Sequence, residues 1–224
     1  HPSYGLKQKT GLAIFVKTPG LSPVKTRLAK SIGREKAESY YIFAAKAVAA
    51  LVSSIPNIQP YWAVAESAGI DNELWRQFPK IFQGEGGLGD RLSHVYDWLL
   101  DHHDSAVLIG ADSPQMTPEI LMQGCERSLE GFVMGPSRDG GFYLFGGHEN
   151  ISPSVWTGIP YSESTTGGNL VAALAPAKVA MLDRLLDTDT FEDVKDLYQD
   201  LSTLKNRLNE QVELFEWIET NLIA

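Results

Sequence analysis

The chain has 224 residues, 43% hydrophobic and 21% charged, which is ordinary for a globular protein and enough to bury a sizeable core. The net charge of −9 argues against a nucleic acid partner, and no stretch approaches the roughly 18 apolar residues of a membrane span. The start of the chain has no signal-peptide pattern and the one cysteine, Cys125, permits no internal disulfide, so we expect a cytoplasmic protein without a membrane partner.

Apolar runs of strand length alternate with helical patterns along the chain. In chain order we expect a strand at 12–16, helices at 25–31 and 34–54, strands at 61–65 and 81–82, a helix at 89–102, a strand at 106–109, a helix from Thr117, strands at 132–134 and 142–145, a helix at 168–174, a strand at 179–182, and helices at 191–199 and 206–222. In the long helix, one face should carry Tyr40, Phe43, Ala47 and Leu51.

This alternation predicts an α/β fold with a mainly parallel sheet and helices on both faces. With no internal repeat and no clear linker, we expect one domain over residues 1–224, with a core at 10–200 and a C-terminal helix at 201–224. In such sheets ligands bind outside the C-terminal ends of the strands, so the residues that follow each strand are the candidates for function.

The loop after the first expected strand is rich in cations. Residues 1–36 hold eight basic residues, from Lys7 to Lys36, against one acidic residue, and three of the eight (Lys17, Lys25 and Arg27) flank or follow this loop. Backbone amides, a helix N-terminus and cations in one place suit a phosphate, although an exposed basic loop is the alternative. Neither a Rossmann fingerprint nor a Walker A sequence is present, which argues against a dehydrogenase and a P-loop ATPase. On the phosphate interpretation, the Lys25 and Arg27 side chains should face solvent until a nucleotide binds.

Three aspartates follow expected strands. Asp112 comes after the strand at 106–109, and Asp187 and Asp189 come after the last strand. Carboxylates are hard oxygen ligands that suit Mg²⁺ or Mn²⁺, and two of them on one face repel unless a cation lies between them. The alternatives are a turn at Asp112 and a helix cap at Thr188 or Asp189. The metal interpretation predicts that Asp112 and the later pair share one crevice with a lysine of the basic loop.

Three glycine-rich segments permit a close approach of backbone to a ligand. One leads into a helix and could contact a base or a phosphate, one joins two strands and could equally be a hairpin turn, and one opens a short helix and is a candidate for acceptor binding. In that order, their candidate residues are Gly86, Gly87, Leu88 and Gly89; Asp139, Gly140 and Gly141; and Gly167 and Gly168.

Four segments, taken together and in order, resemble a known family. They are Phe15-Val16-Lys17 with Val24-Lys25-Thr26-Arg27-Leu28, Gly110-Ala111-Asp112-Ser113-Pro114, Gly135-Pro136-Ser137-Arg138-Asp139-Gly140-Gly141-Phe142-Tyr143, and Leu186-Asp187-Thr188-Asp189-Thr190. From about residue 11 to about residue 196 the chain resembles the DUF2064 family of glycosyltransferase-A-like proteins. That family is similar to the phospholactate and phosphoenolpyruvate guanylyltransferases and, more distantly, to the molybdenum cofactor guanylyltransferase.

The resemblance implies a nucleotide-diphospho-sugar transferase fold and a role for each motif. It implies that Lys17, Lys25 and Arg27 meet nucleotide phosphates, that Asp112, Asp187 and Asp189 hold Mg²⁺ or Mn²⁺, and that the loop from Gly86 to Gly89 approaches the base. The segment from Asp139 to Tyr143 departs from the guanylyltransferases, so the acceptor is the least defined part of the resemblance.

Three functions are compatible with these motifs. The first is a nucleotidyltransferase that joins a nucleoside monophosphate from a nucleoside triphosphate to a small phosphorylated acceptor, with Lys17, Lys25, Arg27 and Asp112 as catalytic residues. The second is a glycosyltransferase that uses a nucleotide sugar. The third is a nucleotide-binding module without catalysis, which the presence of all three aspartates disfavours.

Overall fold

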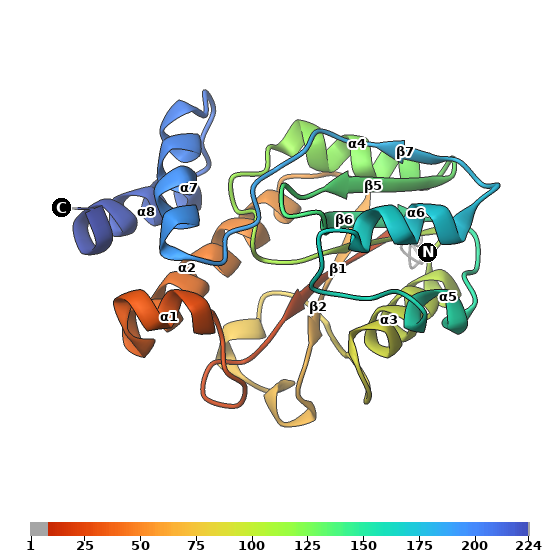
Figure 1. Ribbon diagram of the computed structural model, residues 1–224, viewed down its shortest axis with the longest axis horizontal. Helices are drawn as coiled ribbons and strands as arrows, with labels where there is room; N and C mark the ends of the chain where they lie inside the picture. Colours follow the sequence, from red (N-terminus) through yellow and green to blue (C-terminus); the bar gives the residue numbers. More distant parts are fainter. Residues whose placement is uncertain (1–8, 224) are drawn as a thin grey trace, which may run out of the picture.

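The computed structural model describes residues 9–223, so Lys7 of the basic opening segment lies outside the described residues. Within that range a seven-stranded sheet has the order β3-β2-β1-β4-β6-β5-β7 (Figure 1). Its strands are β1 (Thr10–Val16), β2 (Ile58–Val64), β3 (Lys80–Phe82), β4 (Ser105–Ile109), β5 (Phe132–Pro136), β6 (Phe142–Gly147) and β7 (Val179–Met181). Only β6 runs antiparallel to its neighbours, β4 and β5, which confirms the mainly parallel sheet.

The described chain has eight α-helices, of which the first six lie between strands and the last two follow β7. They are α1 (Thr26–Ile32), α2 (Arg34–Ser53), α3 (Leu88–His102), α4 (Pro118–Ser128), α5 (Pro153–Thr157), α6 (Thr166–Leu174), α7 (Phe191–Thr203) and α8 (Asn209–Ile218). As predicted, Thr117 caps α4: its hydroxyl accepts a hydrogen bond from the Ile120 amide at 3.2 Å, with Pro118 at the first helical position. The sequence did not predict α5, which is too short for a helical period to show.

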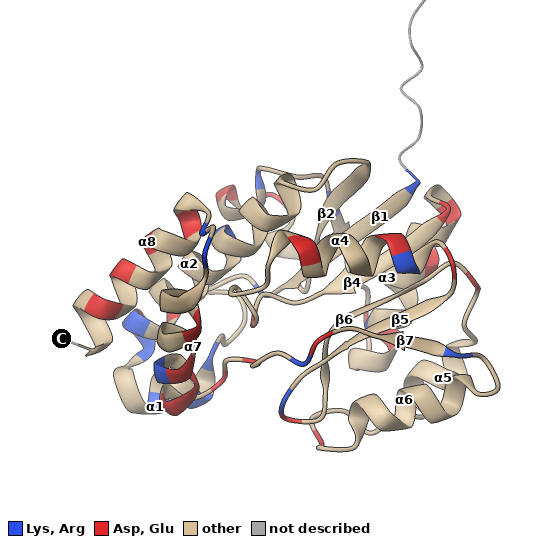
Figure 2. Ribbon diagram, turned by 90° about the horizontal axis from the view of Figure 1, so that it is seen from above, with Lys and Arg blue, Asp and Glu red and all other residues tan. Residues whose placement is uncertain are grey.

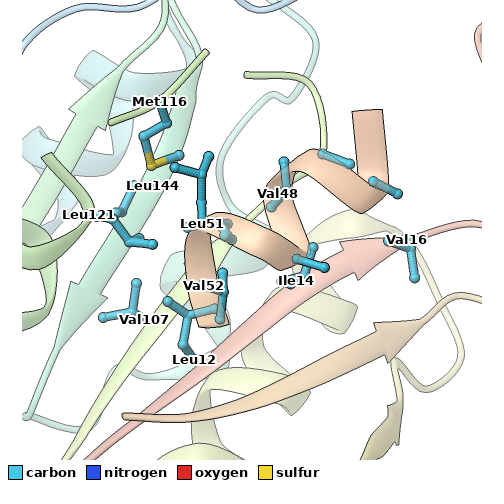
Figure 3. Close-up of a cluster of buried hydrophobic side chains, with 14 of the residues drawn as sticks. Leu12, Ile14, Val16, Val48, Leu51, Val52, Val107, Met116, Leu121 and Leu144 are labelled. Atoms are coloured by element: carbon cyan, nitrogen blue, oxygen red, sulfur yellow. The ribbon is translucent and has the colours of Figure 1, made fainter. Parts of the chain in front are cut away.

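Helices cover both faces of the sheet, as predicted. Along β1 the side chains alternate, so Leu12 and Ile14 belong to one buried cluster with α2 and α4, whereas Ala13 belongs to another with α3, α5 and α6. Figure 3 shows Leu51 and Val52 of α2 lying over β1 in the first of these clusters.

The helix α2 is buried on two sides, which corrects the prediction of a single apolar face. Leu51 packs toward the sheet, but Tyr40 and Ala47 belong to a third cluster that α2 forms with α1, α7 and α8, and Phe43 packs against that cluster (Figure 1). A helix between a sheet and other helices needs apolar residues all round, so its sequence does not show one simple stripe.

The strand directions fix where the loops gather. Because β1, β4, β5 and β7 all run parallel, the segments that follow them leave the same edge of the sheet. These are the basic loop, the Asp112 segment, the turn at 137–141 and the segment at 182–190. Among residues 9–223, no helix is long and apolar enough to cross a membrane.

Candidate nucleotide and metal site

A cleft of about 830 Å³ opens at this edge of the sheet. It brings together most of the residues singled out in the sequence: Lys17, Lys25, Arg27, Leu88, Asp112, Asp139, Gly141, Asp187 and Asp189. It is not lined by six of the candidate glycines: Gly86, Gly87, Gly89, Gly140, Gly167 and Gly168. The cleft therefore gathers the charged candidates at the strand ends, and most of the candidate glycines are not part of its lining.

Asp112 and the late aspartates meet through the backbone between them. The Thr188 amide donates a hydrogen bond to the Asp112 carbonyl oxygen at 2.9 Å, so the two segments are in direct contact. The Lys25 ammonium forms an ion pair with the Asp112 carboxylate and donates to the Thr188 carbonyl at 2.6 Å. Segments more than 70 residues apart in sequence thus share one crevice with a lysine of the basic loop, as the metal interpretation requires.

Buried polar side chains fasten these segments to each other. The Ser113 hydroxyl donates to the Leu186 carbonyl at 2.8 Å, and the Gln115 side chain donates to the same oxygen at 2.9 Å. From α8, the Gln211 amide donates to the Pro114 carbonyl at 2.9 Å. Because all three donors are buried, their hydrogen bonds hold the Asp112 segment in a fixed position relative to the last strand.

The cluster has an excess of negative charge. Burial and the nearby Asp112 carboxylate raise the pKa of Asp187 to about 7, although Lys25 opposes this rise. Asp189 lies farther out, with its side chain 41% exposed, and pairs with the Arg27 guanidinium at 3.1 Å. A buried carboxyl group whose ionisation a neighbouring carboxylate disfavours is a suitable place for a cation.

The donor set fits a hard divalent cation in part. Asp112 and Asp187 supply carboxylate oxygens, the ligands that Mg²⁺ and Mn²⁺ prefer. Among residues 9–223, no group of three or more histidine, cysteine or acidic side chains is arranged to hold a metal ion. This agrees with the usual Mg²⁺ site, which takes one or two carboxylates and is completed by water and substrate phosphates.

The prediction that Lys25 faces solvent is wrong. Its side chain is only 7% exposed, because it reaches across the crevice to Asp112 and Thr188. Burial lowers the pKa of Lys25, but its ion pair with Asp112 and the charges of Asp187 and Asp189 outweigh that effect and raise it, so the ammonium stays charged. Arg27 does face solvent, with its side chain 71% exposed.

The helix-capping alternative for the late aspartates is also wrong. The cap of α7 is Thr190, whose hydroxyl accepts from the Asp193 amide at 3.2 Å, while the Asp193 carboxylate accepts from the Thr190 amide at 2.9 Å. Asp187 and Asp189 are consequently not used as caps, and Figure 2 shows acidic residues continuing along α7 beside the basic residues of α1.

Comparison with known proteins places the chain in a family. Residues 46–163, more than half of the chain, match the family DUF2064, which is described as an uncharacterized protein conserved in bacteria. The chain belongs to the DUF2064 family. No curated protein matches it.

Solved structures show that this DUF2064 chain has a nucleotide-diphospho-sugar transferase fold. A provisionally assigned nucleotide-diphospho-sugar transferase from Desulfovibrio desulfuricans G20 is 24% identical, with a TM-score of 0.84, over 95% of this chain and 96% of its own. A CMP:2-keto-3-deoxy-manno-octonic acid synthetase in complex with CTP is 11% identical, with a TM-score of 0.56, over 84% and 96%. A manganese complex of Rv0371c from Mycobacterium tuberculosis H37Rv is 15% identical, with a TM-score of 0.50, over 88% and 100%.

Sequence analysis missed the residues that hold the basic loop of this DUF2064 chain. The Glu66 carboxylate accepts from the Thr18 amide at 2.9 Å, and the Trp75 indole donates to the Thr18 hydroxyl at 3.0 Å. The Tyr41 hydroxyl accepts from the Lys17 amide at 2.9 Å. Burial raises the pKa of Glu66, but hydrogen bonds from Ser22 and Thr18 outweigh it, so the net effect lowers the pKa. One signal was present in the sequence: Glu66 lies just beyond an apolar strand, as Asp112 does.

The glycines outside the cleft have packing roles that the structure makes plain. A Cβ atom on Gly89 would lie 2.5 Å from the Trp156 carbonyl oxygen, so glycine lets α3 and α5 approach. Asp90 caps the start of α3 by accepting from the Gly87 amide at 3.1 Å. The Gly140 carbonyl accepts from the Gly167 amide at 2.9 Å, which joins the turn at 137–141 to α6. A role for these glycines in ligand binding stays a prediction.

Proposed function

We propose that this chain is a metal-dependent nucleotidyltransferase that joins a nucleoside monophosphate, taken from a nucleoside triphosphate, to a small phosphorylated acceptor. The observation that carries the proposal is the meeting of the Lys25 ammonium, the Asp112 carboxylate and the Asp187 segment in one cleft at the C-terminal ends of the strands. The CTP complex of a protein with the same fold supports a nucleoside triphosphate as the donor.

In this proposal the protein contributes position and charge. Lys17, Lys25 and Arg27 neutralise the phosphates of the donor, and the hydrogen bond from the Lys17 amide to the Tyr41 hydroxyl anchors the start of the loop that carries these cations. The acceptor phosphate oxygen attacks the α-phosphorus, the bond to the β-phosphate oxygen breaks, and pyrophosphate leaves. Phosphoryl and nucleotidyl transfers need little covalent work from the enzyme, so positioning and electrostatic stabilisation account for most of the catalysis.

The carboxylates have a separate role. Asp112 and Asp187 would hold Mg²⁺ or Mn²⁺, with Asp189 available when Arg27 turns to a phosphate, and a bound ion there would neutralise charge on the phosphates. The manganese complex of Rv0371c supports a divalent ion in this fold.

A glycosyltransferase that uses a nucleotide sugar is the second candidate. The observation that favours it is the likeness to the Desulfovibrio protein assigned to the nucleotide-diphospho-sugar transferases. The same cations and carboxylates would then bind a departing nucleoside diphosphate. A binding module without catalysis is the third candidate, and the retention of Asp112, Asp187 and Lys25 in one contact network argues against it.

Thermal unfolding with nucleotides tests the proposal. A nucleoside triphosphate at about 100 times its Kd should stabilise the protein by about 2.7 kcal/mol, which is about 5–10 °C for a chain of this size, and only with Mg²⁺ or Mn²⁺ present. Arg27→Ala should weaken nucleotide binding about tenfold, while Arg76→Ala, another exposed arginine paired with an acidic neighbour away from the cleft, should leave it unchanged.

The panel of ligands discriminates between the candidates. Stabilisation by nucleotide sugars and not by triphosphates would favour the glycosyltransferase. If no nucleotide or nucleotide sugar shifts the transition in any metal condition, both transferase assignments fail.

A further inference from the structure

The two sides of the cleft differ in charge. Among the described residues that line it, the cations are Lys17, Lys25 and Arg27, which all come from the segment after β1. The side formed by residues 137–143 and 161–166, here called the distal wall, contributes two carboxylates and no cation. Nucleotide phosphates therefore have partners on one side only.

The distal wall is a built surface. Its two segments are joined by the hydrogen bond from Gly167 to Gly140, and a Cβ atom on Gly140 would lie 1.9 Å from the Ser164 carbonyl oxygen. Gly140 also has a φ of +94°, a conformation that other residues rarely adopt. This close contact fixes the backbone of the Asp139 segment relative to that of the Glu163 segment.

Among residues 9–223, no side chain forms an ion pair with the carboxylates of the distal wall, Asp139 and Glu163. Asp139 accepts a hydrogen bond from the Gly141 amide at 2.9 Å. Arg138, the cation of the same turn, is absent from the cleft lining and interacts instead with Asp200 of α7, where it opposes the rise in pKa that burial causes.

A buried hydroxyl of the same wall has no partner. Ser137 is 2% exposed and lines the cleft, and its hydroxyl has no hydrogen-bond partner among the described residues. An unsatisfied buried hydroxyl costs free energy that a ligand hydroxyl or amine can recover. Tyr161 and Phe142 line the wall beside it and supply ring surface.

We propose that the distal wall binds the part of the acceptor remote from its reacting phosphate, and that this part is polyhydroxylated and either neutral or amine-bearing. Hydroxyl and ammonium groups donate hydrogen bonds to Asp139 and Glu163, whereas a carboxylate or a second phosphate there would be repelled. The inference rests on the proposed function, because it assumes that the cationic side of the cleft holds the nucleotide.

Three hexose 1-phosphates that differ only at carbon 6, which bears an amine, a hydroxyl group or a carboxylate, test the inference: 6-amino-6-deoxyglucose 1-phosphate, glucose 1-phosphate and glucuronic acid 1-phosphate. Each is titrated calorimetrically into the full chain, with Mg²⁺, in the presence and in the absence of a non-hydrolysable α,β-methylene nucleoside triphosphate. Affinity should fall in the order given, about three- to tenfold for each unit of charge, as expected for charges about 6 Å apart in a largely solvated cleft with an effective dielectric constant of about 40–80.

Variants that change the charge of the distal wall test whether the order of affinities depends on it. Glu163→Gln should reduce the spread of affinities, and Glu163→Lys should move glucuronic acid 1-phosphate ahead of 6-amino-6-deoxyglucose 1-phosphate. Glu130→Gln, which removes an exposed carboxylate at the far end of α4, should keep the wild-type order.

Equal affinities, tighter binding of the glucuronic acid compound, an order that survives Glu163→Lys, or no binding of any probe would each overturn the inference. Binding of the nucleotide analogue is measured on its own first. Its failure would count against the proposed function, and the titrations without nucleotide would still report on the wall.

Discussion

Replacing Asp187 by asparagine should make the free protein more stable at neutral pH. The Asp187 side chain is half-buried in the cleft beside Asp112, and its pKa of about 7 means that ionisation of its carboxyl group is disfavoured in the folded state. Asparagine keeps the shape and removes the charge. If the role of Asp187 is to bind a cation and not to stabilise the fold, the substitution should have two effects. It should stabilise the free protein, and it should weaken metal-dependent nucleotide binding.

The magnitude follows from linkage. The folded pKa of about 7 lies above the ordinary 3.8, so between these values the folded protein binds more protons than the unfolded chain, and stability falls as pH rises. The full difference corresponds to about 4 kcal/mol, which is a ceiling because the side chain is partly exposed to solvent. We expect Asp187→Asn to gain about 1–2 kcal/mol above pH 7, or about 3–6 °C in Tm, and almost nothing at pH 4.

Differential scanning calorimetry from pH 4 to pH 8, without metal, measures this gain. Asp183→Asn is the matched control, because it removes an exposed aspartate of the same segment that does not line the cleft. A Tm difference between Asp187→Asn and the wild type that is constant with pH would refute the reasoning, and so would a less stable variant at pH 8. Addition of Mg²⁺ with a nucleotide should stabilise the wild type more than the variant.

Three further substitutions test the supporting contacts. Glu66→Gln should cost about 1 kcal/mol in urea unfolding and raise the Kd for nucleotide, because the basic loop loses a charged acceptor; an unchanged Kd would remove Glu66 from the site. Lys25→Ala should destabilise the fold by about 1–3 kcal/mol at pH 7, in contrast to Arg27→Ala, and equal stabilities would contradict the buried ion pair. Gly140→Ala should cost at least about 2 kcal/mol, because its Cβ meets the Ser164 carbonyl at 1.9 Å, whereas Gly168→Ala, with no atom within 4 Å of its Cβ, should be neutral or stabilising.

The parts of the fold that the sequence predicted are those with a local period or a local cap. The strand at β1 is an uninterrupted apolar run, and α4 begins at a threonine followed by proline, so both were found near their true bounds. The direction of β6, in contrast, could not be predicted from a local pattern. Nothing in residues 142–147 distinguishes an antiparallel strand from a parallel one, because direction depends on which neighbours the strand meets.

The same distinction applies to the site. The candidates Lys17, Asp112 and Asp187 were found because each follows an apolar run, and topology then guarantees that they share an edge. Burial of a charged side chain was not predictable. Lys25 was expected in solvent because lysine usually is, and only its tertiary partners, Asp112 and Thr188, explain why it is buried. The glycines were predicted to lie near a ligand, but several of them allow two backbone segments to approach each other, as at Gly140. Both situations require a residue without a Cβ atom, so the sequence pattern is the same.

The backbone at Lys25 adds a separate argument for the role of its ammonium. Lys25 precedes α1 with φ 50° and ψ 48°, a left-handed conformation that costs a residue with a side chain about 1–2 kcal/mol and that glycine adopts freely. A residue chosen for the turn alone would be glycine or asparagine. Lysine in this conformation sends its ammonium to the Asp112 carboxylate and the Thr188 carbonyl, which offsets the strain. The strain is therefore tolerated because it places a charge at that point in the cleft, where, under the proposed function, donor phosphates and acidic side chains would meet.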